Sequence, residues 1–280
     1  MEIIKNKTFD AERSLYHVVD ANIENCTFAG PADGESVLKE ARNIHVDQCS
    51  FSLRYPLWHV DHFTLDHSSL DTLTRAPIWY AKNGKILNTS IESIKGVREC
   101  DHIDISNCKI ISNEFGWKSN NIQLTDSVIT SEYLFLDSTN VSLKNVNMKG
   151  KYSFQYMENL TIESCNLDTK DAFWHSKNVT VKNSIVKGEY LAWFSDGLTL
   201  DHCTIIGTQP LCYCKNLTLI DCKMIDTDLA FEYSDVNATI CSSVDSVKNP
   251  RSGKIVAKSI GEIIKEGSIM EDTCEIIVTK

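Results

Sequence analysis

A 19-residue segment recurs along most of this chain, and this repeat limits the folds open to it more than any other feature. Six copies follow one another without an insertion and begin at Asn121, Asn140, Asn159, Asn178, Gly197 and Asn216. Other copies begin at Asn43, His62, Asn83, His102 and, in degenerate form, Asp235. Within this series the step from His62 to Asn83 is longer, at 21 residues. A repeat of fixed length predicts a solenoid in which each copy packs against its neighbours.

Within each copy, the order of side chains indicates short strands. Positions 2 and 4 are Ile, Leu or Val almost throughout and alternate with polar residues, as in a strand with one buried face. Position 9 is apolar again, and Gly150, Gly188 and Gly207 follow two positions later at an expected turn. A copy of this length is too short for a strand, a helix and a return loop. We therefore predict an all-β fold, a parallel β-helix of about 11 or 12 coils with about three short strands each, stacked ~4.8 Å apart.

Stacked coils also account for the residue types at the corners. Asn at position 1 tolerates the left-handed backbone of a corner, and amides stacked one above another can bond to each other. Position 7 is mostly Cys or Ser, with cysteines at Cys49, Cys108, Cys165, Cys203, Cys222 and Cys241. A small, soft side chain packs well in a narrow interior corner, so we interpret these cysteines as structural.

The rhythm of the repeat ends near residue 250. A stack of open strands needs a cover over its last coil, because an exposed edge would pair with another chain. The sequence therefore predicts a β-helix over residues 1–250, with an N-terminal cap at about 1–20, and a C-terminal capping segment over 251–280.

Composition excludes several classes of partner. The net charge is −10 and the pI is about 5.3, so the chain lacks the excess of Lys and Arg that a nucleic-acid partner requires. No apolar run approaches the ~18–20 residues of a membrane span, and the start of the chain shows no secretory signal. The 11 cysteines form no CxxC pair and have no histidine at the spacing of zinc modules. We expect reduced thiols, a cytoplasmic protein, and neither a metal nor a cofactor.

Five stretches that depart from the simple repeat resemble a known family. They are Gly30-Pro-Ala-Asp-Gly-Glu-Ser, Arg54-Tyr-Pro-Leu-Trp-His, Arg75-Ala-Pro-Ile-Trp-Tyr, Asp168-Thr-Lys-Asp-Ala-Phe-Trp-His and Gly207-Thr-Gln-Pro-Leu-Cys-Tyr-Cys. With them, most of the chain resembles an uncharacterised, mainly bacterial family of domains of unknown function within the pectate-lyase-like superfamily of right-handed parallel β-helices. The resemblance implies right-handed coils. The wider superfamily suggests carbohydrate lyases, hydrolases or esterases, but fold alone does not assign an activity.

Positions 13 to 17 form the expected third strand and are rich in aromatic residues. In an unbroken strand positions 13, 15 and 17 share one side, which places these rings outside: Tyr133, Phe135, Tyr152, Phe154, Tyr156, Phe173, Tyr190 and Tyr213. Position 16 then points inward at Trp174 and Trp193. It also holds Arg98 and Gln155, which suit a core badly, so a bend that reverses the parity is the alternative. With either parity one outer face is unusually aromatic, and these ten rings are the candidate ligand contacts.

The candidate catalytic residues beside these rings are Asp137, Asp171 and His175. His175 is expected to stack between Tyr156 and Phe194. Asp137 then lies two coils away, at roughly 10 Å, and Asp171 lies four residues earlier, at roughly 13 Å along an extended strand. Neither separation is a hydrogen bond, so no acid–base pair is preassembled. The alternative is that these residues are polar members of a surface ladder.

Two irregular segments are expected near the same face. Arg75, in the 21-residue step, can reach it from one side. The loop at residues 30–40 either brings Asp33, Glu35 or Lys39 to the face or is an ordinary surface loop.

Two functions of different kinds fit the aromatic face. The first is binding of a carbohydrate, as a small molecule or a glycan, with or without hydrolase or lyase activity, because flat rings repeated along a solenoid suit repeated sugars. The second is a structural or protein-interaction scaffold that uses the face for self-association as a homo-oligomer, since aromatic residues are also enriched in interface cores. The missing secretory signal favours the second function, because polymeric glycans usually lie outside the cell.

Overall fold

Parallel strands one repeat apart build both parts of this chain. The computed structural model describes residues 1–30 and 34–279. It divides into unit 1 (Met1–Val141) and unit 2 (Ser142–Lys280). Each unit is a stack of right-handed parallel coils, and the two together hold about 14 turns of roughly 19 residues. The fold is therefore the predicted parallel β-helix.

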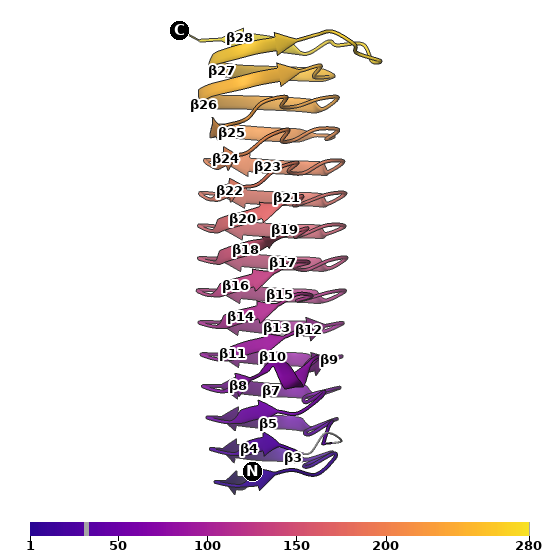
Figure 1. The fold of residues 1–280 in the computed structure, drawn as a ribbon, viewed down its shortest axis with the longest axis vertical. Helices are drawn as coiled ribbons and strands as arrows, with labels where there is room; N and C mark the ends of the chain where they lie inside the picture. Colours follow the sequence, from indigo (N-terminus) through magenta and orange to yellow (C-terminus); the bar gives the residue numbers. More distant parts are fainter. Residues whose placement is uncertain (31–33, 280) are drawn as a thin grey trace. The chain divides into compact units, whose positions relative to one another are not determined.

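In unit 1 each coil begins with a strand of the long sheet and continues with a shorter strand. The first strands are β1 (Glu2–Lys5), β3 (Val19–Glu24), β5 (Arg42–Asp47), β7 (Asp61–Asp66), β10 (Lys82–Leu87), β13 (Asp101–Ser106) and β15 (Asn120–Thr125). The second strands are β2 (Thr8–Phe9), β4 (Thr27–Ala29), β6 (Ser50–Ser52), β8 (Ser69–Leu70), β11 (Ser90–Ser93), β14 (Lys109–Ser112) and β16 (Val128–Ser131). Strands β3, β5 and β7 follow one another along the stack (Figure 1), with Ile44 paired to Phe63.

Unit 2 repeats this arrangement, and strand β17 (Thr139–Lys144) contains the point of division. The first strands of its coils are β19 (Glu158–Glu163), β21 (Lys177–Lys182) and β23 (Asp196–Asp201); the second strands are β18 (Asn147–Lys151), β20 (Asn166–Lys170), β22 (Ile185–Lys187) and β24 (Thr204–Ile206). The longer strands β25 (Leu217–Ile225), β26 (Asp235–Lys248) and β27 (Ser252–Ile264) precede the final strand, β28 (Glu275–Val278).

The coils extend into both segments that were expected to be caps. Strand β1 pairs in parallel with β3, with Ile4 opposite Ile23, so the first residues form a coil of their own. Strand β28 pairs in parallel with β27, with Ile255 opposite Ile276. The larger number of turns follows from these added coils.

The corner ladders form as predicted. Asn159 and Asn178 both have a left-handed backbone, and the Asn178 amide donates to Asn159 Oδ1 at 3.3 Å. At position 7, the Cys165 backbone N–H donates to Ser184 Oγ at 3.0 Å, and the Val146 N–H donates to Cys165 Sγ at 3.4 Å. Cysteine and serine can therefore replace each other at this corner, because either side chain accepts a hydrogen bond from the backbone N–H of the previous coil.

The thiols of the cysteine ladder are buried except that of Cys241, which is half-buried. Burial raises the pKa of the Cys49 thiol to about 12 and that of the Cys222 thiol to about 11. A thiol that stays protonated is a poor nucleophile and a poor metal ligand, which agrees with a structural role.

The predicted third strand is replaced by a turn in most coils. Among the described residues, strand is found there at β9 (Ile78–Trp79) and β12 (Val97–Arg98), which pair with each other. In the coil of Asp171, residues Asp171, Phe173 and His175 all have positive φ, at 52°, 63° and 56°. This turn segment still bonds to its neighbours, since the Phe173 N–H donates to the Ser153 carbonyl at 2.9 Å.

Alternating left-handed residues break the parity of an extended strand. Ala172 and Phe173 both face the core, Trp174 is half-buried and His175 is exposed. The prediction that Phe135, Phe154 and Phe173 lie on the outside is therefore wrong: each is at most 1% exposed. Within unit 2 the rings of Phe154 and Phe173 stack in the core with centroids 5.1 Å apart.

In the described part of the chain, no helix is long and apolar enough to span a membrane. The single helical element there is the 3-10 turn η1 (Thr72–Thr74), which lies in the 21-residue coil.

Candidate functional site

The outer aromatic residues of unit 2 form a stacked ladder. The rings of Tyr156, His175, Phe194 and Tyr213 follow one another with centroids 5.0, 5.0 and 4.9 Å apart and interplanar angles of 8°, 9° and 16°. The predicted position of His175 between Tyr156 and Phe194 is confirmed. Because each ring covers the face of the next, the ladder presents mainly ring edges to solvent. A sugar that packs its apolar side on a ring needs an open face, so this ladder is a poor carbohydrate platform.

The tryptophans at position 16 clamp neighbouring coils together. Trp174 Nε1 donates to the Tyr190 carbonyl at 2.6 Å, and Trp193 Nε1 donates to the Gln209 carbonyl at 2.8 Å. Gln155 makes the same bond, from Nε2 to the Asp171 carbonyl at 2.9 Å. In each case the donor at position 16 reaches the carbonyl at position 13 of the next coil. Gln155 thus replaces a tryptophan as the donor. This bond explains why a polar residue stands at position 16 of that coil.

The remaining tyrosines of the predicted surface lie at position 13 and are half-buried. In unit 2, Tyr152 lies beside Lys151, whose Nζ is 5.4 Å from the ring centroid, and Tyr190 lies beside Lys170 at 5.3 Å. In unit 1, the Tyr133 ring meets the edge of Trp117 at 5.9 Å. These rings already have partners within the protein.

The candidate catalytic residues do not form an acid–base group. Asp171 is buried, whereas His175 is exposed and held between two rings. Within the described chain, no hydrogen bond or ion pair joins either side chain to the other. Asp137 is an exposed residue of unit 1. In unit 2 the structure therefore gives no support to proton transfer between Asp171 and His175.

Burial does change the acidity of one of these groups. It raises the pKa of the Asp171 carboxyl above its ordinary value; Lys170 opposes the rise and Glu189 adds to it. Lys170 and Glu189 pair with each other at 3.0 Å. Asp171 is thus a buried carboxyl beside Lys170, and Lys170 already pairs with Glu189.

Replacing Asp171 with asparagine is expected to stabilise the protein more at neutral pH than in acid. Burial raises the pKa of Asp171 in the folded state. The contribution of Asp171 to stability is therefore complete below the unfolded-state pKa of about 3.9, and it is lost as the pH rises through the folded-state pKa. Chemical unfolding of both proteins at about pH 4 and pH 7 measures the difference. Asp168→Asn, at a more exposed carboxyl 3.7 Å from Lys187, is the control. A pH-independent difference for Asp171→Asn would contradict the expected burial.

The 21-residue coil of unit 1 departs from the regular pattern. Its extra residues form η1, which is capped by Asp71: the Leu73 N–H donates to Asp71 Oδ1 at 2.9 Å, and Ser52 Oγ donates to Asp71 Oδ2 at 2.5 Å. The turn ends at Arg75, whose φ of 52° and ψ of −64° lie outside the favoured regions for a residue with a side chain. Such a conformation costs of order 1–3 kcal/mol and persists where the surroundings hold it.

The backbone of Arg75 is hydrogen-bonded to the next coil, whereas its side chain makes no such bond among the described residues. The Arg75 carbonyl accepts hydrogen bonds from the N–H groups of Ile94 and Lys95, at 3.2 and 2.8 Å. Among residues that the structure describes, no hydrogen bond or ion pair engages the Arg75 guanidinium. The insertion therefore anchors the Arg75 backbone, and the guanidinium is exposed and has no counterion among the described residues.

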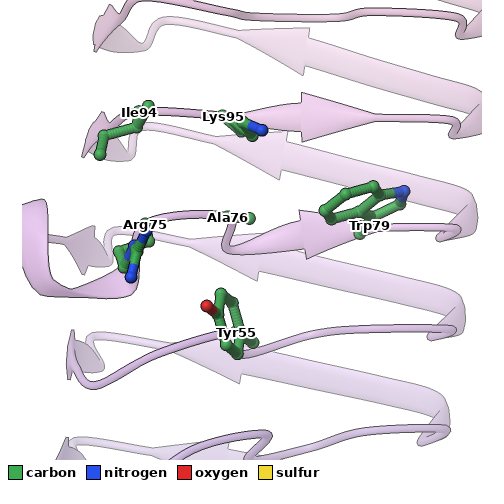
Figure 2. A pocket seen from close by; sticks show the side chains of 6 residues that line it. All are labelled: Tyr55, Arg75, Ala76, Trp79, Ile94 and Lys95. Atoms are coloured by element: carbon green, nitrogen blue, oxygen red, sulfur yellow. The ribbon is translucent and has the colours of Figure 1, made fainter.

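Beside Arg75, one small residue leaves a gap among the side chains that occupy position 13 in successive coils. Trp58 Nε1 donates to the Ala76 carbonyl at 2.7 Å, the bond that elsewhere marks position 13, so Ala76 occupies that position. The neighbouring coils have the larger Tyr55 and Lys95 there. The small alanine leaves a pocket of about 110 Å³, lined by Tyr55, Arg75, Ala76, Trp79, Ile94 and Lys95 (Figure 2).

The two charged residues that line this Arg75 pocket, Arg75 and Lys95, are both cations. Lys95 lies 3.8 Å from Glu114, which also receives a hydrogen bond from Arg98 at 3.1 Å. Arg98 in turn lies over the Trp79 ring, 4.9 Å from its centroid. The lining residues that the structure describes carry no carboxylate, imidazole or thiol, and their two cations, Arg75 and Lys95, suit an anion.

Only part of this site could be found from the sequence. Arg75 was expected near the aromatic face because of the longer coil, but Trp79, Lys95 and Ala76 were not identified. Their signal is an alanine at a position where the other coils have tyrosine or a larger polar residue. Of the loop residues considered, Asp33 lies outside the described residues, and Glu35 pairs with Arg54 at 3.5 Å.

Comparison with solved structures finds other β-helices at low identity. The A-module of the mannuronan C-5 epimerase AlgE6 from Azotobacter vinelandii has a TM-score of 0.54 and 10% identity, over 95% of this chain and 91% of that chain. PfbA, a surface adhesin of Streptococcus pneumoniae, has a TM-score of 0.45 and 10% identity, over 86% and 82%. The catalytic domain of a GH87 α-1,3-glucanase has a TM-score of 0.40 and 9% identity, over 99% and 64%. These likenesses concern the fold alone.

Comparison with known sequences agrees with the resemblance noted from the five irregular stretches. No curated protein matches the chain. Residues 2–278 match the family described as "Protein of unknown function (DUF3737)". Because this match extends over nearly the whole chain, the protein belongs to that family.

Proposed function

We propose that the protein binds an acidic carbohydrate, with one anionic sugar unit in the Arg75 pocket. The observation that carries this proposal is the guanidinium of Arg75, whose backbone is anchored in an insertion and which lines one pocket with Tyr55 and Trp79. A guanidinium suits a sugar carboxylate because its planar set of donors can bond both oxygens. Adjacent rings supply the apolar contact that a sugar also needs.

Charge and topology favour this ligand class over a neutral sugar. In a chain of net charge −10, a pocket with Arg75 and Lys95 on its lining is a local exception. The neighbour with a TM-score of 0.54 is named as an epimerase of mannuronan, and by analogy this agrees with a carbohydrate ligand. Because the lining lacks the pair of carboxylates that most glycoside hydrolases use, we propose binding rather than hydrolysis in this pocket.

The test is a titration of intrinsic tryptophan fluorescence with acidic and neutral oligosaccharides of equal length. We expect a saturable change with oligouronates, since Trp79 lines the pocket, and no saturation with neutral oligomers. Arg75→Ala should weaken binding about 10- to 100-fold, because a hydrogen bond to a charged group contributes about 1.5–3 kcal/mol. Arg42→Ala removes the same charge from an exposed residue outside the pocket and should bind normally.

Two results would overturn the proposal. One is equal binding of neutral and acidic oligomers. The other is an unchanged affinity in Arg75→Ala when Arg42→Ala is equally unchanged. Arg75→Lys adds a graded control, because it keeps the charge and loses the planar fork of donors.

A second candidate function is self-association through the stacked ladder of unit 2. Tyr156 is 55% exposed and Phe194 is 44% exposed, so their ring edges form an apolar surface suited to a second copy of this chain. The molar mass of the same samples, followed across protein concentration, distinguishes the two functions. A constant monomer mass would exclude this scaffold role.

A further inference from the structure

Two carboxylates and an imidazole converge at one corner of unit 1. Strand β5 ends at Asp47 and strand β7 ends at Asp66, one coil later, so the two side chains lie in neighbouring coils on the same outer face. His67 follows with a left-handed backbone, φ 41°. One ligand atom from each of the three residues lies within 4.8 Å of the others.

The spacing of these atoms fits a single metal ion. His67 Nδ1 lies 3.0 Å from Asp66 Oδ1 and 3.4 Å from Asp47 Oδ1. Two ligands that are each about 2.1 Å from one ion lie ~3.0 Å apart at a right angle and ~3.4 Å apart at a tetrahedral angle. Both distances from His67 to the carboxylates therefore match those between two ligands of one ion.

Amide donors hold both carboxylates in place. Gln48 Nε2 donates to Asp47 Oδ2 at 3.2 Å, and Asn88 Nδ2 donates to Asp66 Oδ1 at 2.8 Å. The inner oxygen of Asp47, Oδ1, is buried and has no hydrogen-bond partner among the residues the structure describes. A buried oxygen without a donor costs about 1–3 kcal/mol, more when charged, so a bound cation would remove this cost.

Aspartate–histidine pairs recur at other corners and account for part of this geometry. His62 lies 2.9 Å from Asp61, and His202 lies 2.5 Å from Asp201. In unit 2, however, the second carboxylate, that of Asp221, faces the opposite ring nitrogen of His202 at 4.0 Å. The corner of His67 differs because Asp47 Oδ1, which has no hydrogen-bond partner among the described residues, faces the same nitrogen of the His67 ring as Asp66 does.

We propose that Asp47, Asp66 and His67 bind a divalent first-row transition-metal ion, with water completing its coordination. One imidazole and two carboxylates are a donor set for Mn²⁺ or Zn²⁺ rather than for Ca²⁺, which takes oxygen ligands alone. The sequence predicted no metal, because the ligands come from two coils and lack the spacing of a local motif. This site is separate from the Arg75 pocket and does not depend on the proposed carbohydrate.

The test measures Mn²⁺ binding to the full chain after treatment with a chelator. Mn²⁺ is the probe because it avoids thiols, and its free form is counted by electron paramagnetic resonance. We expect one saturable equivalent, displaced by Zn²⁺ as the order of metal affinities requires, and not displaced by equimolar Ca²⁺. Absence of saturable Mn²⁺ binding, together with absence of Zn²⁺ binding by calorimetry, would overturn the site.

Matched variants separate the site from the other corners. His67→Asn places there a residue that the same corner position has at Asn88 and Asn107, so the fold should be retained. We expect His67→Asn and Asp47→Asn each to weaken Mn²⁺ binding at least about tenfold. His202→Asn, the equivalent change in unit 2, should leave the affinity unchanged. Equal losses in His67→Asn and His202→Asn would contradict the proposal, and unfolding in excess chelator checks that the variants are folded.

Discussion

Replacing Phe173 with alanine is expected to lower the free energy of unfolding by about 3–5 kcal/mol. Its ring is 1% exposed and stacks on Phe154 at an interplanar angle of 16°. Removing it loses the transfer energy of a large apolar side chain and leaves a cavity that the stacked coils cannot readily close, since their backbones bond to one another on both sides.

The control for this experiment lies one coil further on. Phe194→Ala removes the same side chain from position 17, where it is 44% exposed and contacts His175 and Tyr213. We expect a loss of about 1 kcal/mol, the scale of an aromatic pair. Chemical unfolding with unchanged slope measures both variants. Equal losses, or a larger loss for Phe194→Ala, would show that the sides assigned to positions 15 and 17 are wrong.

Replacing Gly84 with alanine is expected to cost about 1–3 kcal/mol, the usual cost of an overpacked core. Gly84 occupies position 2, which elsewhere holds a large apolar residue, and it pairs with Phe63 in the preceding coil. A β-carbon on Gly84 would lie 2.1 Å from Phe63 Cε1, far inside van der Waals contact. The glycine therefore provides the space that the larger Phe63 ring fills.

A double-mutant cycle tests this account directly. Phe63→Leu removes the ring atoms that a β-carbon at Gly84 would meet, so Phe63→Leu with Gly84→Ala should cost less than the sum of the single variants. Residues in such contact typically show coupling of about 0.5–3 kcal/mol. Additive costs would mean that Gly84 is required for its backbone and not for the space beside it.

The sequence predicted the coils and their core strands well because these features depend on local, periodic physics. An apolar residue at every second position of a strand must face the core, and identical copies must stack in register to bury it. Asn159 and Asn178 at the corners and Cys165 in the interior follow from the same repetition. The exceptions at Phe63 and Gly84 compensate each other across one pair of coils, which no single copy of the repeat reveals.

The surface could not be predicted in the same way. Its geometry depends on a turn in which Asp171, Phe173 and His175 adopt left-handed conformations, and this turn moves phenylalanines inward and leaves tryptophans as clamps between coils. Sequence patterns assume an extended strand and therefore assign the wrong side to Phe135, Phe154 and Phe173.

The sequence by itself determined the repeat, the parallel stacking and the buried ladders, because each depends on residues within one copy and the identical place in the next. Only the tertiary structure decided which groups come together: Arg75 and Trp79 line one pocket at the gap left by Ala76, and Asp47 meets His67 across one coil. The physical reason is that these contacts depend on how an insertion or corner directs side chains from different coils. Backbone conformation sets that direction, and composition alone does not specify it.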